Sequence, residues 1–294
     1  MLNYRTPSRI IFEIITIILL VLLCVSIVVP FINAMAISLS SSNAVLRGTI
    51  GLWPKEFQMD AYKMLAGNYT FLRSFANTVF LTIVNTILVI VVSLAAAYAL
   101  ASKNMLGKKI FFYYILLTMF FSGGLIPTYL LVNGLGLNNT YWALILPGIC
   151  SVFYIIVFKN VIDQLPQELL ESAEMDGASD LLLLFRIVLP LVLPMTMAFT
   201  IFSAVAFWNE WFGVMLYIRD KNLWTLQYQL RDILMSAQLS NEMRPGSLKE
   251  HLRIVDPQNL KMAALMLTVL PIIVVYPFVQ KYFIHGQMVG AVKG

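Results

Sequence analysis

Long apolar runs, separated by short polar segments, make up most of the chain. An α-helix needs about 20 consecutive apolar residues to cross the hydrocarbon core of a bilayer, and six runs are close to that length. The pattern therefore predicts an all-α, polytopic membrane protein with six transmembrane helices. The predicted spans are about Ile10–Ile37, Leu72–Ala101, Ile110–Leu131, Tyr141–Phe158, Leu191–Ile218 and Lys261–Phe283.

The first run could also be a signal peptide, because Arg5 and Arg9 precede it and small residues follow it. A signal peptide has an apolar core of about 7–15 residues, and this run is longer. Its length favours an uncleaved first span.

Glycine and proline interrupt three of the predicted spans. Broken helices are tolerated in lipid where neighbouring helices or water satisfy the freed backbone groups. Two interpretations stay open, because such residues can serve close helix packing or line a central cavity. The breaks are Gly123-Gly124 with Pro127 in the third span, Pro147-Gly148 in the fourth, and Pro271 and Pro277 in the sixth.

The distribution of lysine and arginine predicts the orientation, since short cytoplasmic loops carry an excess of these residues. Both termini and the loop after the second span are basic, whereas Val132–Thr140 has no basic residue. We therefore expect both termini to lie in the cytoplasm. The long Arg219–Asn259 segment is then external, and its length suggests a small helical lid or a docking surface.

Composition agrees with a membrane protein, because 60% of the 294 residues are hydrophobic and only 12% are charged, against roughly 25% charged in soluble domains. The net charge of +5 reflects the basic loops and needs no nucleic acid, for which no motif is present. Cys24 and Cys150 lie in apolar runs and are expected to be packing residues. Without a phosphate-binding loop, a histidine cluster or a catalytic carboxylate pair, we expect no catalytic, cofactor or metal site in this chain.

One acidic segment stands out between the apolar runs. Pro166 can begin a helix, and Glu168 and Glu171 would lie near the positive end of its dipole. Gly177 is expected to end that helix, and Ser179 to cap a second one. Because Pro190 and Pro194 follow, the sequence predicts a helix, a sharp bend, a second helix and a further change of direction.

The acidic segment contains, in this order, Glu171, Ala173, Asp176-Gly177-Ala178, Phe185, Ile187, Leu189-Pro190 and Pro194, and the C-terminus contains Gln280–Phe283 and Gly290–Gly294. The acidic segment resembles the EAA loop of binding-protein-dependent ABC importer permeases, except that Ser172 stands where the family usually has alanine. The C-terminus is similar to the tail of the carbohydrate subfamily, on the side related to the six-span permease of the maltose transporter. Within that subfamily the chain looks most similar to permeases for complex oligosaccharides and polysaccharide fragments.

The resemblance implies one transmembrane domain over residues 1–294 with the type I importer fold, a core at about 72–283, a coupling loop at about 166–190 and a tail at 284–294. It implies a non-catalytic permease subunit in the bacterial cytoplasmic membrane that imports carbohydrate, and more specifically oligosaccharide. The implied partners are membrane lipid, a second permease in a heterodimer, two ATPase subunits that bind ATP and Mg, and an external sugar-binding protein, with no nucleic acid.

Two contacts with the ATPases are implied by the same resemblance. The loop would dock in a cleft of an ATPase through Glu171, Ala173, Asp176, Gly177, Ala178, Phe185 and Pro190. The tail would reach the interface between the two ATPases through Gly290, Ala291, Lys293 and Gly294.

A second candidate region lies at the outer end of the fifth span, where Trp208, Asn209, Glu210 and Trp211 are consecutive. Aromatic rings beside polar groups suit sugars, and a carboxylate at membrane depth usually faces a cavity or a partner. An interfacial aromatic belt explains the two tryptophans equally well. Asn77, Asn85 and Tyr154 are weaker candidates for the substrate pathway, because isolated polar residues in spans often bond neighbouring helices.

Two functions of other classes remain as alternatives. An ion-driven secondary transporter would show inverted repeats and acidic residues near mid-membrane, and no clear repeat is visible. A membrane-embedded scaffold or sensor without transport is the other.

Overall fold

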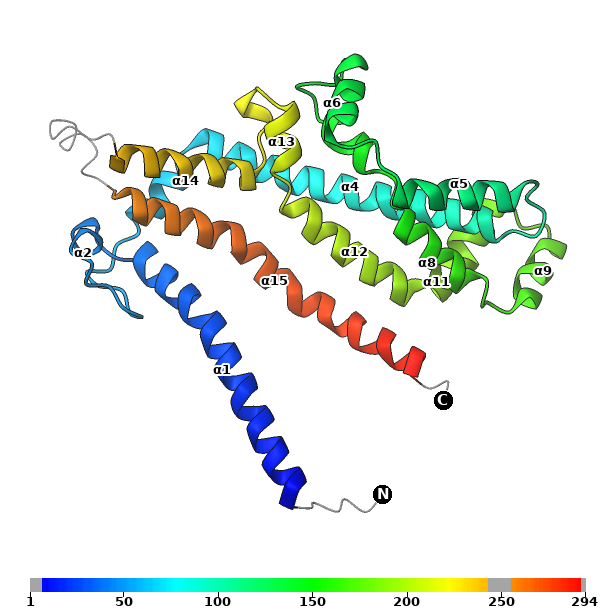
Figure 1. Cartoon of the computed structure of the whole chain (residues 1–294), viewed down its shortest axis with the longest axis horizontal. Helices are drawn as coiled ribbons and strands as arrows, with labels where there is room; N and C mark the ends of the chain where they lie inside the picture. Colours follow the sequence, from blue (N-terminus) through cyan, green and yellow to red (C-terminus); the bar gives the residue numbers. More distant parts are fainter. Residues whose placement is uncertain (1–6, 243–254, 292–294) are drawn as a thin grey trace. The chain divides into compact units, whose positions relative to one another are not determined.

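The computed structural model describes residues 7–242 and 255–291, and every regular element in these ranges is helical (Figure 1). The predicted all-α fold is therefore confirmed. The chain divides into two compact units, Met1–Asn68 with Leu230–Leu270 and Tyr69–Gln229 with Pro271–Gly294.

The first unit contains α1 (Pro7–Ser38), α2 (Ser42–Leu46), α3 (Asp60–Ala66) and the beginning of α15 (Pro257–Ala291). Large apolar side chains are exposed along most of α1, and its buried residues lie only near its C-terminal end. There the side-chain amide of Asn259 donates to the carbonyl oxygens of Ile37 and Ser40, at 3.1 and 2.6 Å. The start of α15 is thus bonded to the end of α1, while the rest of α1 presents the apolar surface expected of a helix in lipid.

The second unit is built around α4 (Tyr69–Ala101), which packs on α8 (Val152–Ile162) and α12 (Leu193–Trp208). Their shared core is apolar and aromatic, and the rings of Tyr154 and Phe199 stack with centroids 4.1 Å apart. The α4 helix contains no proline or glycine, so its 33 residues form one uninterrupted element. The fully buried side chains of this core include Ala97, Phe158 and Val188.

Three helices in the described ranges are long and apolar enough to cross a membrane, or up to six elements if each bent helix pair forms one span. The long helices are α1, α4 and the Pro257–Val275 part of α15. The bent pairs are Lys108–Phe120 with Leu125–Gly134 at 113°, Trp142–Gly148 with Val152–Ile162 at 44°, and Asp180–Leu191 with Leu193–Trp208 at 87°. The first pair is α5 and α6, the second joins α7 (Trp142–Ile145) and η1 (Leu146–Gly148) to α8, and the third leads into α12.

The breaks expected in the third and fourth spans are where the sequence placed them. Gly124, with φ of +85°, lies between α5 and α6. Pro147 and Gly148 lie in the 3-10 turn η1 before α8. At both positions the backbone leaves the α-helical path because glycine adopts conformations that other residues avoid and proline lacks a donor.

Two expectations from the sequence differ from the structure. The fifth span was expected to continue to Ile218, but α12 ends at Trp208 and α13 (Phe212–Tyr217) is a separate short helix. The sixth helix was expected to break, but α15 continues as one helix through Pro271 and Pro277. A proline removes one hydrogen bond, and a long helix can continue past it when the remaining bonds hold.

The segment after α13 is partly helical, as the sequence suggested. It contains η3 (Lys221–Leu223) and α14 (Leu226–Glu242).

Candidate functional site

The acidic segment folds as a helix, a turn and a second helix, which confirms the predicted shape. The first helix is α9 (Gln167–Met175), and the second begins with α10 (Asp180–Leu182). We call residues 167–182 the elbow. Pro166 precedes α9 in the N-cap position with φ of −58°, and Glu168 lies in the first turn, where a carboxylate interacts favourably with the helix dipole.

The turn of the elbow is a Schellman motif closed by Gly177. The amide of Gly177 donates to the carbonyl oxygen of Glu174 at 3.0 Å, and the amide of Ala178 donates to that of Ala173 at 3.1 Å. These two bonds define the motif and require a left-handed residue at its centre. Gly177 has φ of +80°, and a Cβ atom added there would meet no atom within 4 Å. The glycine is therefore required by backbone conformation and not by crowding within this chain.

Ser179 has the extended backbone of an N-cap residue, but its side chain makes no cap hydrogen bond. Ser179 therefore occupies the predicted N-cap position, but the predicted hydrogen bond from its side chain is not formed.

Beyond the elbow the chain enters the core through a π-helical segment, η2 (Leu183–Val188). Leu183, Leu184 and Val188 are buried there, whereas Phe185 is exposed. Short α11 (Leu189–Leu191), which contains Pro190, follows and the chain then turns by 87° into α12. The elbow is therefore joined directly to a core helix of the second unit.

Glu171 lies on the exposed side of α9 and forms an ion pair with Lys103, with 2.8 Å between Oε1 and Nζ. Lys103 belongs to the loop after α4, and both side chains are more than half exposed, at 60% for Glu171 and 64% for Lys103. An ion pair this exposed contributes little to stability. The Glu171 carboxylate stays exposed beside Lys103, so a partner can bind its second oxygen, Oε2, while Oε1 keeps the ion pair.

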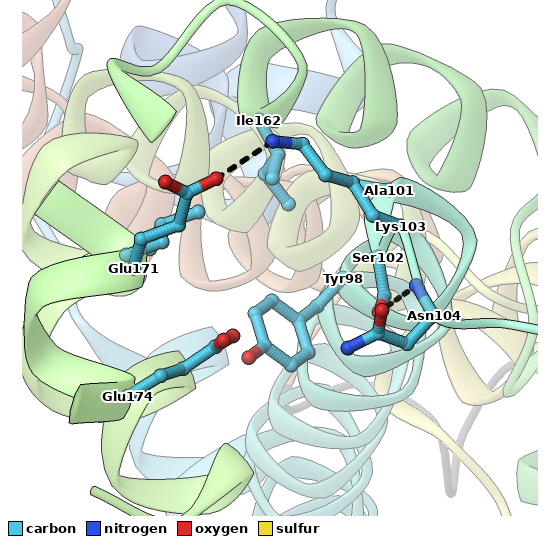
Figure 2. Close-up of a pocket in the computed structure, with 9 residues that line it drawn as sticks. Tyr98, Ala101, Ser102, Lys103, Asn104, Ile162, Glu171 and Glu174 are labelled. Carbon is cyan, nitrogen blue, oxygen red and sulfur yellow. Dashed lines mark hydrogen bonds and ion pairs between the residues drawn. The ribbon is translucent and has the colours of Figure 1, made fainter. Parts of the chain in front are cut away.

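A cavity of about 160 Å³ lies under α9, between this helix and the end of α4 (Figure 2). The Tyr98 hydroxyl donates to the Asp180 carboxylate at 3.3 Å, and Figure 2 shows the Glu174 carboxylate pointing toward the same tyrosine. The remaining lining residues are Ala101, Ser102, Lys103, Asn104, Ile162, Leu170 and Glu171.

A second cavity, of about 530 Å³, surrounds Glu210, and we call it the Glu210 groove. One carboxylate oxygen of Glu210 accepts a hydrogen bond from the amide of Gly213 at 2.6 Å, at the start of α13. The groove combines polar and aromatic side chains, a composition that suits a ligand with both hydroxyl groups and C–H faces. Its lining includes Ser122, Thr128, Phe207, Phe212 and Tyr217.

The elbow helix α9 and the short helix α13, whose first turn bonds Glu210, lie toward different ends of α4 (Figure 1). Tyr98 bonds the elbow, whereas Asn77 bonds the carbonyl oxygens of Asn222 and Trp224 near the groove. The 21 positions between Asn77 and Tyr98 correspond to about 30 Å along a helix axis, which equals the thickness of the bilayer hydrocarbon. If α4 crosses the membrane, the elbow and the Asn222–Trp224 segment face opposite sides.

The family model described as "Binding-protein-dependent transport system inner membrane component" matches residues 94–287, a range that includes the elbow and every residue that lines the Glu210 groove. The chain belongs to this family. The resemblance drawn from the elbow motif is therefore confirmed, and the chain is a multi-pass permease of the inner membrane.

Similar proteins cover nearly the whole permease. It is 39% identical to Protein LplC of Bacillus subtilis (strain 168) over 267 residues, which is 91% of this chain and 90% of that protein. It is 37% identical over 272 residues to the polygalacturonan/rhamnogalacturonan transport system permease protein YtcP of the same strain, covering 91% and 93% of the two chains. A chain from the crystal structure of a bacterial ABC transporter involved in the import of the acidic polysaccharide alginate matches it with a TM-score of 0.87 and 28% identity, over 96% of this permease and 99% of that chain.

The aromatic residues expected in the substrate pathway are not gathered at one place in the permease. Trp208 is buried, packs edge-to-face on Phe75 with centroids 6.0 Å apart, and lines an apolar cavity of about 350 Å³ that does not include Glu210. Trp211 contacts Phe212 in a T-shaped pair. Asn209 is exposed and accepts a hydrogen bond from the side chain of Gln227 at 3.0 Å. Of the four consecutive candidates, Glu210 alone lines the groove.

The weaker pathway candidates bond the permease itself. Besides its two carbonyl partners, Asn77 accepts a hydrogen bond from the Tyr141 hydroxyl at 2.8 Å. Asn85 is buried and approaches the carbonyl oxygen of Leu144 at 3.5 Å. Tyr154 accepts a hydrogen bond from Ser203 at 3.2 Å beside its stacked partner in the core. These contacts give each residue a packing role and leave its role in transport a prediction.

The C-terminal tail is helical as far as the structure describes it. Gly290 and Ala291 belong to the end of α15, whereas Lys293 and Gly294 lie outside the described residues. The expected contact of this tail with ATPases stays a prediction.

Sequence reasoning missed the roles of Tyr98 and Asp180 and the partner of Glu171. In the sequence, Lys103 is one of the basic residues of the loop after the second predicted span, and it was used only to predict orientation. No local pattern links residues 68 positions apart, as Lys103 and Glu171 are, so no signal in a single sequence could have paired them.

Proposed function

We propose that the chain is one of two different permease subunits of an ATP-driven importer of oligosaccharides, with ATP bound and hydrolysed by partner subunits. The observation that carries this proposal is the elbow, whose glycine-closed turn and accessible Glu171 carboxylate stand out from the exposed side of a core built on α4, α8 and α12. An exposed turn that continues into a core helix is suited to receive a mechanical push from a partner.

The substrate class is supported by the similar proteins. YtcP is named for polygalacturonan and rhamnogalacturonan transport, AraQ of Bacillus subtilis, at 30% identity, for arabinooligosaccharides, and the solved transporter for alginate. All three names refer to chains of several sugars. An oligosaccharide is therefore a better-supported substrate than a monosaccharide.

In the proposed mechanism, closure of two ATPase subunits around ATP moves the elbow. Glu171 pairs with a basic residue of the ATPase cleft, while Ala173, Asp176, Gly177 and Ala178 give the turn its shape. The movement passes through the π-helical segment that bears Phe185, and past Pro190, into α12. In this proposal the elbow and both termini lie in the cytoplasm, and the tail supplies a second ATPase contact.

On the other side, an external binding protein delivers the sugar to the permease pair. We place the sugar path of this subunit along the Glu210 groove, where Phe207, Phe212 and Tyr217 offer ring faces and Ser122 and Thr128 offer hydroxyl groups. The second permease completes the path. Arg219–Asn259 contributes to the docking surface for the binding protein.

The experiment is uptake into proteoliposomes that contain this subunit with its partner permease and ATPases, supplied with the binding protein. The sugars are oligogalacturonides, rhamnogalacturonan fragments, arabino-oligosaccharides and alginate oligosaccharides. We expect at least one of them to enter when ATP is present. Uptake driven by an imposed ion gradient without ATP would favour a secondary transporter and refute the proposal, and no uptake of any sugar would favour a scaffold.

The coupling role is tested in the same vesicles with Glu171→Lys. We expect transport to be lost while the subunit stays in the membrane, because the reversed charge repels the basic residue of the cleft. A matched control is Asp60→Lys, which reverses a carboxylate that also forms a solvent-exposed ion pair, with Lys63 on α3, outside the elbow. Normal uptake by Glu171→Lys at normal expression would refute coupling through this residue.

A further inference from the structure

The C-terminal end of α4, which we propose lies on the cytoplasmic side, bonds both arms of the elbow, namely α9 and α10. On the first arm, Glu171 of α9 accepts from Lys103 at 2.8 Å. On the second arm, Asp180 of α10 accepts from the Tyr98 hydroxyl at 3.3 Å. The two carboxylates lie on either side of Gly177 in the chain, so the end of α4 bonds both helices that the turn joins. Figure 2 shows the first of these bonds, between Lys103 and Glu171.

These bonds matter because α9 has few other restraints. The helix has nine residues, and the structure gives its Pro166 end no side-chain cap. A helix this short is marginal in isolation, so its position depends on tertiary contacts. Among its described side chains none is fully buried, and Leu170 is the residue that packs, partly buried, against the core.

The other end of α4 is bonded to the segment that borders the Glu210 groove. The Asn77 amide donates to the carbonyl oxygens of Asn222 and Trp224 at 2.7 and 3.0 Å, and the Thr78 hydroxyl accepts from the amide of Leu226 at 2.7 Å. The Thr225 hydroxyl in turn donates to the carbonyl oxygen of Glu210 at 2.7 Å. Between these ends, α4 contains no proline or glycine, the residues at which helices most often kink.

We infer that α4 links the elbow mechanically to the Glu210 groove, and that Tyr98 and Lys103 at one end and Asn77 at the other are positioning residues for transport. The inference rests on the proposed coupling function of the elbow. Movement of the elbow would then reach the groove by two routes. One follows the chain into α12, and the other crosses the bonds of Lys103 and Tyr98 into α4. Since α4 holds both arms, the elbow and α4 move together when an ATPase displaces the elbow.

The first test measures the position of the elbow without any partner. Hydrogen exchange is followed in peptides covering residues 167–178 of the full-length permease in lipid nanodiscs. Lys103→Met combined with Tyr98→Phe should speed exchange there by roughly two- to fivefold, the range expected for losing exposed polar contacts. The double variant Lys109→Met with Tyr114→Phe is the matched control, because it removes the same groups from exposed positions on α5.

The second test measures sugar taken up per ATP hydrolysed by the reconstituted complex. The probe is the panel sugar that the wild-type complex transports best. The Lys103→Met and Tyr98→Phe variants should each lower this ratio by roughly twofold, and the double variant by more, while Lys103→Arg retains it because the guanidinium can replace the ammonium in the pair. A purely structural role would change the amount of complex and leave the ratio unaltered.

The outcomes separate this inference from the proposed function. Unchanged exchange, or faster exchange with an unchanged transport ratio, overturns the role of α4 even when Glu171→Lys abolishes uptake. Normal uptake by Glu171→Lys overturns the coupling function itself. A lowered ratio in the double variant, with the Lys109 and Tyr114 control like wild type, supports the inference.

Discussion

Replacing Gly177 tests the elbow most directly, because the structure separates two possible costs of the substitution. Its φ of +80° is strained for any residue with a side chain, yet a Cβ atom would meet nothing within 4 Å in this chain. Within the permease alone the cost is therefore conformational. Gly177→Ala and Gly177→Leu should destabilise the turn equally, and Gly177→Asn less, since asparagine tolerates the left-handed conformation.

The magnitude follows from the conformation. A residue with a side chain costs about 1–2 kcal/mol in the left-handed region, which lowers the population of the closed turn by a factor of roughly 5–30. The two hydrogen bonds that close the motif, from the amides of Gly177 and Ala178, would open by the same factor. Hydrogen exchange at these amides in the isolated permease measures it.

ATP-dependent uptake by the assembled complex then shows whether a partner surrounds the turn. If an ATPase cleft encloses the elbow, leucine must clash where alanine does not. We therefore expect Gly177→Leu to abolish ATP-dependent uptake and Gly177→Ala to reduce it only in proportion to the strain. The difference between the two variants measures the crowding that the partner adds.

Gly136 offers a control with the same local geometry. It closes a second Schellman motif at the end of α6, has φ of +68°, and would also place a Cβ atom in open space. Gly136→Leu should cause similar local strain and leave uptake largely intact. Our reasoning would be refuted by normal uptake of Gly177→Leu, or by an equal loss in Gly136→Leu, which would show that the effect is general destabilisation.

Three further predictions concern other positions. Ser172→Ala should leave uptake unchanged and alter stability by less than about 0.5 kcal/mol, because the serine side chain is exposed and bonds only its own helix; a large loss of uptake would reveal a role for the hydroxyl. Asn77→Leu should destabilise the permease by about 1–3 kcal/mol, since it removes three hydrogen bonds, one of them to the carbonyl oxygen of the buried Trp224, and an unchanged thermal unfolding midpoint would contradict this. Gly213→Ala should displace Glu210, because the new Cβ would lie 3.1 Å from its carboxylate, and should weaken α13 by about 1 kcal/mol. Gly148→Ala, whose nearest contact is an ordinary 3.4 Å, should be milder by the same unfolding measurement.

Some features of the fold could be read from local sequence because they depend on one residue's backbone. Gly124 and Gly177 adopt positive φ at the bends where the sequence placed them. The end of the fifth helix could not be read in this way, because Phe212–Tyr217 continues the apolar pattern after Trp208. The side chain of Glu210 instead bonds the first turn of α13 and separates it from α12.

The prolines of α15 show the opposite case, in which the sequence predicted a break that the structure does not have. Pro147 lies at a break before α8, yet the helix α15 continues through both Pro271 and Pro277. Whether a proline ends a helix depends on whether the surrounding contacts hold the remaining backbone bonds, and a sequence pattern does not contain those contacts.

The sequence by itself determined that this protein is a helical membrane protein, where most of its apolar helices lie, and that its acidic segment turns at Gly177. These properties follow from apolar run length and from the φ preferences of single residues, so neighbours along the chain suffice to determine them. The tertiary structure alone decided that Lys103 pairs with Glu171, that Tyr98 reaches Asp180, and that Glu210 lines a groove without its tryptophan neighbours. Such contacts depend on how helices distant in sequence pack and rotate against one another, and many packings are compatible with the same local pattern.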